Sequence, residues 1–435
     1  MLSEKELEEV LRKMLSRISS VNALYIRRVA EQIKTIGELN ASSIHILNTI
    51  ADLDADRNIA EITRKLAEAT ALNVADLMVL YQKALDDAVA SPDFVRYVEL
   101  QQEKEAAEQA EIKPKSQEAA ETELGTKEKP LETKVQPLQY VPEETRARIL
   151  NFTQAVSQQT AAKMYNLSNT TVIQETYKNA IDTAVTAVAA GYDSYGAASR
   201  DIIRKYYQEH TRGVLKDTAF NGIQVEYESG YRRRLDTAVR QNVIDGAKQI
   251  NQQAAFMMGE ALGFDAFEIS AHMMSAPDHE PVQGHVFLKA EFEKMQNGFD
   301  CRDVDGKFYQ GFRRPISEWN CGHFASPFDT EISKRRWSDE ELAEYERKNA
   351  AGVEINGKHM TRYQASQYMR RLETEIRRWK DTANAAKTAD DMELRRECQR
   401  HINKRRRVYN AVAEAAHIRP DPERLRVEGF RSVRV

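Results

Sequence analysis

The sequence has no long apolar run, few cysteines, and little proline or glycine. No stretch of the 435 residues holds about 18 apolar residues in succession, so we expect no transmembrane helix. Three cysteines cannot build a disulfide framework, which favours a reducing compartment. With 18 glycines and 11 prolines, an all-β architecture is disfavoured. The first residues, MLSEKELEEV, lack the basic start and apolar stretch of a signal peptide. We therefore expect a mostly helical intracellular chain.

The charge is distributed unevenly along the chain. Charged residues make up 30% of the sequence and the net charge is −4. Residues 331–435 hold 25 Lys and Arg against 18 Asp and Glu, a balance of +7, which leaves −11 for the first 330 residues. A basic end on an acidic body is typical of contact with nucleic acid or an acidic protein surface. A solvated helical face with many i,i+4 ion pairs gives the same pattern.

Composition and periodicity predict a mainly α chain with a small α+β domain. Residues 101–136 contain nine glutamates, six lysines and no aromatic residue, so they cannot bury enough apolar area to fold. On either side the apolar residues recur at helical or strand spacing. We expect a helical N-terminal module at 1–100, a charged flexible linker at 101–140, a helical middle domain at 141–260, a small α+β domain at 261–330 and a basic C-terminal helical hairpin at 331–435.

Capping boxes and apolar spacing place the helices. Ser3 with Glu6, Ser338 with Glu341 and Thr361 with Gln364 have the spacing of a capping box and predict three helix starts. In residues 227–253 the apolar positions are mostly spaced for one helical face, which would leave Arg232–Arg234 and Arg240 largely on the other faces. The apolar positions that predict N-terminal helices include Ile26, Val29, Ile33 and Ile36.

Two patterns predict strands in the small α+β domain. In residues 266–272, Phe267 and Ile269 alternate with Glu268 and with polar residues up to His272, as in a half-buried strand. Further on, Asp305-Gly306 stands between short apolar stretches, which predicts a hairpin with a type I′ turn.

Histidine and cysteine concentrate in the same domain. Four of the nine histidines and two of the three cysteines lie between residues 272 and 323. His272, His279, Cys321 and His323 would supply a nitrogen- and sulfur-rich tetrahedral set for a structural zinc. Only Cys321 and His323 are as close in sequence as structural zinc ligands usually are. We therefore expect no cofactor, and keep a structural zinc as the alternative to buried loop residues.

Signals for catalysis are weak. Asp278-His279, Asn320 and His323 follow the order of a His-Asn-His nuclease, in which a histidine activates water and a cation holds phosphate. The separation between His279 and Asn320 is long for such a site. Phosphate-cradling glycine loops and a GxSxG nucleophile elbow are both missing, so we expect no enzyme.

Two basic runs are candidate contacts for nucleic acid or a partner protein. They lack interleaved aromatic residues and a reading motif, so we expect ordinary solvated helix faces and keep contact with phosphate as the alternative. The candidate residues are Arg232, Arg233, Arg234, Lys404, Arg405, Arg406 and Arg407.

Five short blocks, in a fixed order, resemble a known family. They read YESGYRRRLDTAVRQNV, EISAH, PDH…VQG, WNCGH…SPF and, more weakly, TRYQASQYMRRLETEIRRWK. In this order they resemble the phage minor capsid protein 2 family of tailed bacteriophages, which looks related to the Mu F-type head morphogenesis proteins. The family generally has arginine or lysine near Met274–Ala276, at His285 and at Gly322. Loss of these groups favours a structural role over a catalytic one.

The resemblance implies a minor structural protein of a phage head. Such a protein is made in the host cytoplasm and built into the virion in low copy near the portal and the capsid interior. It would act in head assembly or in genome packaging and ejection. Its expected partners are the portal protein, the major capsid or scaffolding protein and packaged DNA, with no membrane. Two alternatives stay open: a metal-dependent nuclease or effector domain at 261–330, and DNA binding through the basic C-terminal helices.

Overall fold

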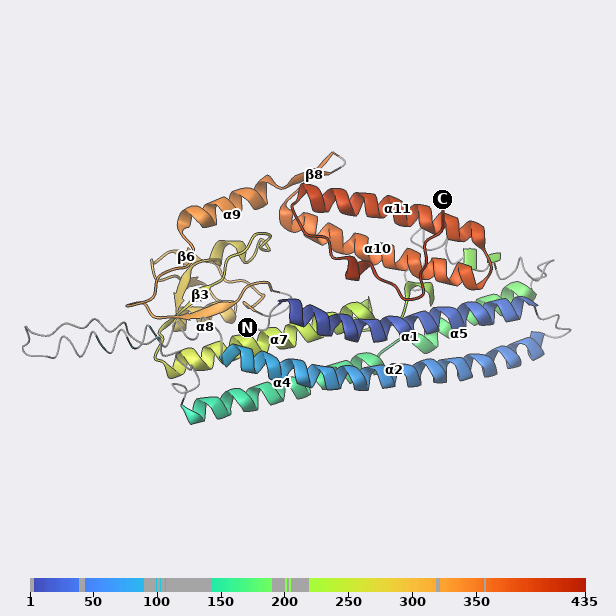
Figure 1. The fold of residues 1–435 in the computed structure, drawn as a ribbon, viewed down its shortest axis with the longest axis horizontal. Helices are drawn as coiled ribbons and strands as arrows, with labels where there is room; N and C mark the ends of the chain where they lie inside the picture. The colour runs from blue at the N-terminus through green and yellow to red at the C-terminus, as the bar shows by residue number, and fades with distance from the viewer. Residues whose placement is uncertain are drawn as a thin grey trace, which may run out of the picture. The chain divides into compact units, whose positions relative to one another are not determined.

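The computed structural model describes residues 4–38, 44–89, 142–189, 219–317, 321–355 and 357–435, with a few isolated positions between them. Helices dominate this part, and the small sheets are antiparallel, which confirms the predicted fold class (Figure 1). Ser3 and nearly all of the expected linker at 101–140 lie outside the described residues. Contacts group the chain into two units, the first made of residues 1–6, 78–158 and 244–347 and the second of 7–77, 159–243 and 348–435. The five-segment division along the chain stays a prediction.

Long helices make up most of the described residues between 4 and 189. Four helices cover the described N-terminal and middle residues: α1 (Glu4–Glu38), α2 (Ile44–Val89), α4 (Glu143–Asn169) and α5 (Ile173–Ala189). The predicted apolar positions of α1 are all buried: Ile26, Val29, Ile33 and Ile36. Polar pairs add to this packing, since the Tyr177 hydroxyl donates to Gln32 Oε1 at 2.8 Å and Tyr25 and Thr176 share a 2.8 Å hydrogen bond.

The predicted C-terminal hairpin is confirmed. It follows the strand pair β8 (Val353–Ile355) and β9 (Lys358–Met360), and consists of α10 (Arg362–Thr388) and α11 (Met392–Ala415), with the short helix η4 (Pro422–Leu425) after them. Thr361 and Gln364 form the capping box that starts α10. The Asp391 side chain accepts from the Leu394 amide and caps α11. Between the two helices the Trp379 and His401 rings stack at 4.3 Å.

The first basic run does not lie on a helix, and that prediction was wrong. After the short helix η2 (Ala219–Asn221), β1 (Gln224–Glu226) pairs with β2 (Arg232–Arg234), and α7 (Leu235–Ala261) begins directly after it. Gly230 has φ +74, a conformation that lets the chain turn between the strands. The three arginines are in the ladder because their backbone pairs with β1 in a hairpin, and apolar periodicity does not report backbone pairing.

The first unit contains the predicted α+β domain. Its sheet has the order β4-β3-β7, with β3 (Ala266–Ile269), β4 (Val286–Leu288) and β7 (Ala325–Phe328) all antiparallel. The helices η3 (Glu280–Val282) and α8 (Lys289–Gln296) flank β4. The predicted strand is confirmed, but its half-burial is wrong, because all four residues of β3 are buried. The face of the sheet expected to meet solvent is covered at Glu268, whose side chain accepts a 2.6 Å hydrogen bond from the Arg336 amide.

The predicted hairpin is also present, with a different turn. Its strands are β5 (Cys301–Arg302) and β6 (Phe308–Tyr309). A type I′ turn needs positive φ at both central residues, whereas only Gly306 has it, at φ +82. The Gly306 amide donates to Asp303 O, and Asp303 and Lys307 close the loop, so this is a longer loop with glycine in the left-handed position. The helix α9 (Asp339–Ala351) starts at the predicted Ser338–Glu341 capping box.

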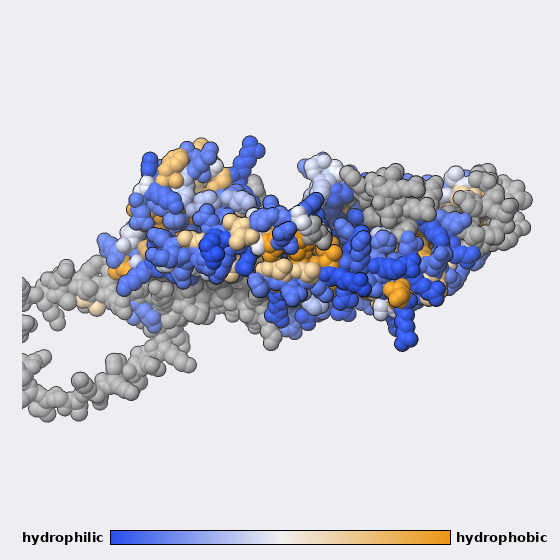
Figure 2. Space-filling view, turned by 90° about the horizontal axis from the view of Figure 1, so that it is seen from above, coloured by the Kyte–Doolittle hydropathy of each residue, from blue (hydrophilic) through white to orange (hydrophobic). Residues whose placement is uncertain are grey.

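Figure 2 shows a largely hydrophilic face on which hydrophobic residues form small separate groups. Among the described helices, none is long and apolar enough to cross a membrane.

Candidate metal centre and basic surfaces

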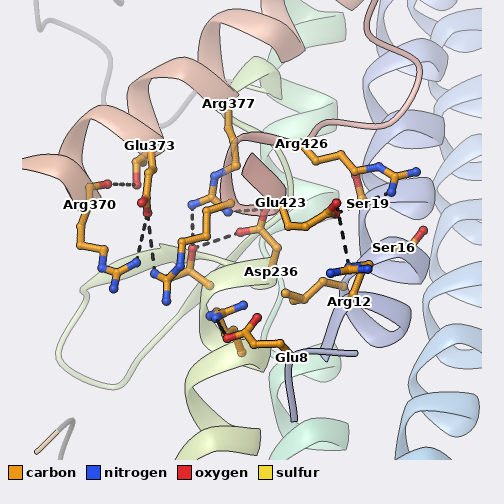
Figure 3. A pocket seen from close by; sticks show the side chains of 15 residues that line it. Glu8, Arg12, Ser16, Ser19, Asp236, Arg370, Glu373, Arg377, Glu423 and Arg426 are labelled. Atoms are coloured by element: carbon orange, nitrogen blue, oxygen red, sulfur yellow. Dashed lines mark hydrogen bonds and ion pairs between the residues drawn. The ribbon is translucent and has the colours of Figure 1, made fainter. Parts of the chain in front are cut away.

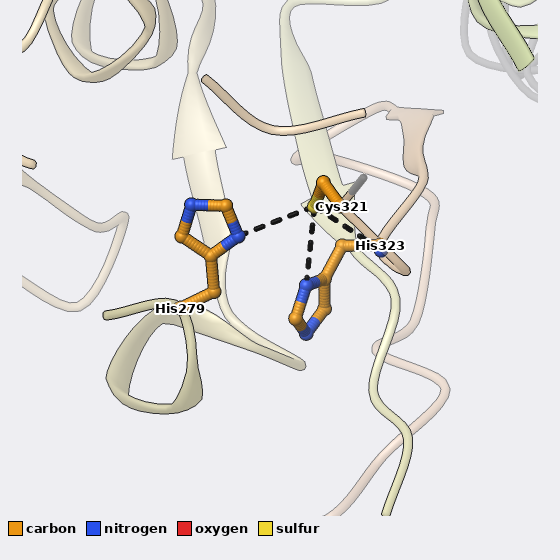
Figure 4. Close-up of side chains that lie close together, drawn as sticks. All are labelled: His279, Cys321 and His323. Atoms are coloured by element: carbon orange, nitrogen blue, oxygen red, sulfur yellow. Dashed lines mark hydrogen bonds between the residues drawn. The ribbon is translucent and has the colours of Figure 1, made fainter. Parts of the chain in front are cut away.

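Three predicted ligand residues meet in the interior of the first unit. His279 immediately precedes η3, and Cys321 and His323 lie just before β7. Their relative exposures are 0%, 2% and 3%. One potential ligand atom from each lies within 4.8 Å of the others (Figure 4). The structure thus brings together residues that are 42 positions apart along the chain.

Hydrogen bonds orient the His279 ring. Its Nε2 lies 2.6 Å from the Arg314 carbonyl oxygen, which can only accept, so the proton sits on Nε2. The other nitrogen, Nδ1, is left with a lone pair and lies 3.2 Å from Cys321 Sγ. The Arg314 guanidinium also approaches this Nδ1 at 3.5 Å, although its closest contact is with Asp278 at 2.7 Å.

The His323 ring is held in the same way. Its Nε2 faces Ser275 Oγ at 3.2 Å and Gln283 Oε1 at 3.5 Å. Gln283 Oε1 also accepts from the His272 amide, and the Ser275 hydroxyl has the Ala276 carbonyl as its acceptor. Both oxygens are therefore placed to accept the Nε2 proton, and Nδ1 carries the lone pair 3.5 Å from Cys321 Sγ.

Burial keeps the three groups neutral. It lowers the pKa of His279, and lowers the pKa of His323 to about 2, because a charged imidazolium is poorly solvated there. It raises the pKa of the Cys321 thiol for the same reason. The Lys248 ammonium donates to the Cys321 carbonyl oxygen and brings a positive charge close to the sulfur.

The fourth predicted ligand, His272, lies next to the group and not within it. Its ring centroid is 4.3 Å from that of His323. His272 Nδ1 is 3.0 Å from the Met273 carbonyl oxygen, while Nε2 is buried with no hydrogen-bond partner among the described residues. A Cβ at Gly322 would be only 2.7 Å from this Nε2, so the small residue makes room for the ring.

The nuclease alternative gains little from this geometry. Asn320 lies outside the described residues. His279 is fully buried, and the proton on its Nε2 is bound to a backbone carbonyl. Asp278 is engaged by Arg314. Such an arrangement suits a buried structural site better than a base that must reach a substrate.

The arginines of β2 have different surroundings. Arg232 pairs with Glu226 at 2.6 Å and with Glu175 at 2.9 Å. The Arg233 guanidinium lies over the rings of Tyr227 and Tyr231, at 6.0 and 5.7 Å from their centroids.

Arg234 is buried and belongs to an internal ion-pair cluster. Its Nη1 donates to Asp381 Oδ2 and to the Asn221 carbonyl oxygen, both at 2.7 Å. Its Nη2 is 3.1 Å from Asp236, which also pairs with Arg377 at 3.1 Å. Burial alone would raise the pKa of Asp236, but the guanidinium groups of Arg234 and Arg377 outweigh it and hold the pKa well below its usual range.

The second basic run is split between the inside and the outside of the hairpin. Arg405 pairs with Glu375 and lies over the Trp379 ring, 5.2 Å from its centroid. Lys404, Arg406 and Arg407 are exposed. Lys404 and Arg407 form a row with the exposed residues Arg396 and Arg400. The four positions are spaced four, four and three residues apart, so they lie on one face of the helix. This α11 basic stripe consists of Arg396, Arg400, Lys404 and Arg407, and none of the four has an ion pair with a described residue.

A polar pocket in the second unit was not predicted. It has a volume of about 130 Å³ and is lined by side chains of α1, α7, α10 and the segment around η4 (Figure 3). Six arginines line it, together with four acidic residues: Arg12, Arg240, Arg370, Arg377, Arg424, Arg426, Glu8, Asp236, Glu373 and Glu423. Most are paired with one another, as Arg377 is with Asp236 and Arg370 with Glu373. No short motif could have revealed it, since the lining runs from position 8 to position 426.

Comparison with known proteins assigns the chain to a family. Residues 59–412 match the model of the family described as phage minor capsid protein 2. The chain belongs to the phage minor capsid protein 2 family. The match covers the three converging residues, β2 and the α11 basic stripe, and confirms the resemblance seen in the sequence. This minor capsid protein has a structural role in the phage head. No match was found among curated proteins or solved structures.

Proposed function

We propose that this minor capsid protein acts at the portal vertex, on the inner side of the head, where it binds the portal protein during assembly. The observation that carries the proposal is the family match over residues 59–412, which gives the role in the head. The placement at the portal comes from the resemblance to head morphogenesis proteins. The action is binding and not catalysis, which the full burial of His279 supports.

A binding experiment tests the portal placement. The purified chain is passed over the immobilised portal protein of the same phage, and in parallel over its major capsid protein and its scaffolding protein. We expect saturable retention on the portal. Retention only on the major capsid or scaffolding protein would contradict the placement at the portal vertex.

An infection that lacks this chain tests the role in assembly. We expect it to produce fewer DNA-filled heads.

The α11 basic stripe favours a second candidate function, contact with packaged DNA. The four exposed cations of the stripe extend over about three turns of the helix, so that they could follow one side of a polyanion. They have no acidic partner among the described residues. Arg405 is excluded from this surface because it faces Trp379 and Glu375. Nonspecific contact with phosphates needs no base-reading motif.

Salt dependence measures the number of phosphates that the stripe contacts. Four contacts predict a slope of log Kobs against log salt of about −3 to −4. Reversing the four charges to glutamate should abolish most of this slope. A matched control reverses four exposed cations elsewhere in the second unit: Lys163, Lys358, Lys387 and Arg434. Equal losses in the two variants would show that net charge, and not the stripe, causes binding.

A further inference from the structure

We propose that His279, Cys321 and His323 hold a Zn²⁺ ion through the two Nδ1 atoms and Sγ, and that this ion stabilises the small α+β fold of the first unit. This inference concerns the fold of the chain and does not rest on its place in the phage head.

The spacing of the donor atoms fits a tetrahedral site. With Zn–N of about 2.0–2.1 Å and Zn–S of about 2.3 Å, tetrahedral geometry sets nitrogen and sulfur ligands about 3.6 Å apart. The distances from Cys321 Sγ are 3.2 Å to His279 Nδ1 and 3.5 Å to His323 Nδ1. One ligand atom from each of the three residues lies within 4.8 Å of the others, so shifts of the rings that bring the donors around a common centre would admit the ion.

The surroundings have the hydrogen bonds that zinc histidines usually make. A histidine ligand commonly donates its other ring N–H to a carbonyl or carboxylate, which fixes its tautomer. His279 Nε2 donates to the Arg314 carbonyl oxygen, and His323 Nε2 faces Ser275 Oγ and Gln283 Oε1. Both rings thus direct a lone pair on Nδ1 toward the same sulfur. Burial without an ion would not require the two tautomers to agree.

The donor types select the metal. Imidazole and thiolate are soft or borderline ligands that suit zinc, whereas magnesium and calcium require oxygen donors. A further nitrogen lies beside the site, because the buried His272 Nε2 has no hydrogen-bond partner among the described residues and the centroid of its ring is 4.3 Å from that of His323. When zinc binds, the Cys321 thiol loses its proton to solvent, and the S–H bond is replaced by a Zn–S bond.

The position of the site explains what the ion would do. It connects the segment before η3 to the segment before β7, which is an outer strand of the β4-β3-β7 sheet. The strands of this sheet are only three or four residues long. A small sheet with long connections gains stability when a metal joins two of them.

The test uses the full chain, stripped with a chelator and then dialysed against Zn²⁺ alone. We expect one zinc per chain by elemental analysis, a higher Tm with zinc, and release of about one proton from the thiol at neutral pH. Replacement of zinc by Co²⁺ should give the charge-transfer absorption of a thiolate ligand. A folded wild-type chain that binds no zinc would overturn the proposal.

Variants identify the ligands, with controls of the same type. Cys321→Ser and His323→Gln should each weaken zinc binding at least 100-fold, and Cys321→Ser should remove the thiolate–Co²⁺ absorption. The matched controls are Cys301→Ser and His285→Gln, which change a buried cysteine and a histidine of the same unit that lie outside the group. Zinc affinity is expected to be unchanged in both. If Cys301→Ser weakened binding as much as Cys321→Ser, the assignment would be wrong. Circular dichroism of the metal-free variants separates loss of a ligand from failure to fold.

Discussion

Removal of the Asp381 carboxylate is expected to destabilise the second unit strongly. Asp381 is 0% exposed, and its two oxygens accept from Arg234 Nη1 at 2.7 Å and from Asn22 Nδ2 at 3.1 Å. In Asp381→Ala, the buried Arg234 guanidinium keeps Asp236 but loses its closest carboxylate, and the Asn22 amide loses its acceptor. Breaking one side of a buried pair typically costs about 3–5 kcal/mol. Because Asp236 still compensates part of the charge, we expect the lower end, about 3 kcal/mol.

The assay is urea unfolding followed by the fluorescence of Trp379, which lies in α10 of the second unit. Trp319 and Trp337 are first changed to phenylalanine, so that the signal reports this unit alone. The matched control is Arg233→Ala, from the same run of arginines, whose contacts with Tyr227 and Tyr231 predict a loss below about 1 kcal/mol.

A double-mutant cycle separates the ion pair from its burial. Arg234→Met combined with Asp381→Ala should be less destabilising than the sum of the two single changes by at least about 1 kcal/mol, because no buried charge is then left uncompensated. The reasoning is refuted if Asp381→Ala costs no more than Arg233→Ala, or if the two changes are additive.

Three further predictions concern the site, the pH dependence and one glycine. Gln283→Ala removes an acceptor of the His323 ring and should weaken zinc binding about 10–100-fold, measured by competition with a chelator, whereas an unchanged affinity would contradict the role of this amide. The pKa of Asp236 is lowered in the folded state, so its stabilising contribution is complete at neutral pH and is lost as the pH falls below the unfolded pKa of about 3.9. Wild type should therefore lose more unfolding free energy than Asp236→Asn between pH 6 and 3, and parallel curves would count against this. Gly284 has φ +71, and a Cβ there would lie 2.5 Å from the Leu342 side chain, so Gly284→Ala should cost about 2 kcal/mol or more. Gly263→Ala is its control, because Gly263 has φ +77 with no atom in the way, and an equal loss in both variants would remove the steric argument.

Local patterns in the sequence were enough to predict the helices. The capping boxes at Ser338 and Thr361 form as expected, and the predicted apolar positions of α1 are buried. These features depend on residues three to seven apart, which one sequence displays directly. The C-terminal hairpin follows because two such helices are separated by a short turn.

The spacing of apolar residues did not predict three features of the strands and turns correctly. Arg232–Arg234 form a strand only because β1 lies beside them, and β3 is buried on both faces because a distant segment around Arg336 covers Glu268. The turn at Asp305-Gly306 differs from type I′ because only Gly306 takes a positive φ. The deciding features are a backbone pairing, a backbone dihedral angle and a contact from a distant segment, none of which the spacing of apolar residues reports.

The candidate site was predictable in part. Its histidines and cysteines cluster in sequence, and three of the four expected ligands meet. The agreement of the two tautomers could not be foreseen, since it depends on the carbonyl of Arg314 and the side chain of Gln283. Half of the α11 basic stripe was predicted from the sequence, because Lys404 and Arg407 belong to the basic run. Arg396 and Arg400 join the stripe only through their helical spacing and their exposure, which the structure shows.

The most direct test of the proposed role is the copy number of this chain in purified DNA-filled heads, relative to the portal and major capsid proteins. Heads are treated with nuclease, purified by density and quantified by mass spectrometry against labelled peptides of all three proteins. We predict that the chain is present in far fewer copies than the major capsid protein and in a fixed ratio to the portal. Absence from purified heads, or a ratio fixed to the major capsid protein, would contradict a place at the portal vertex.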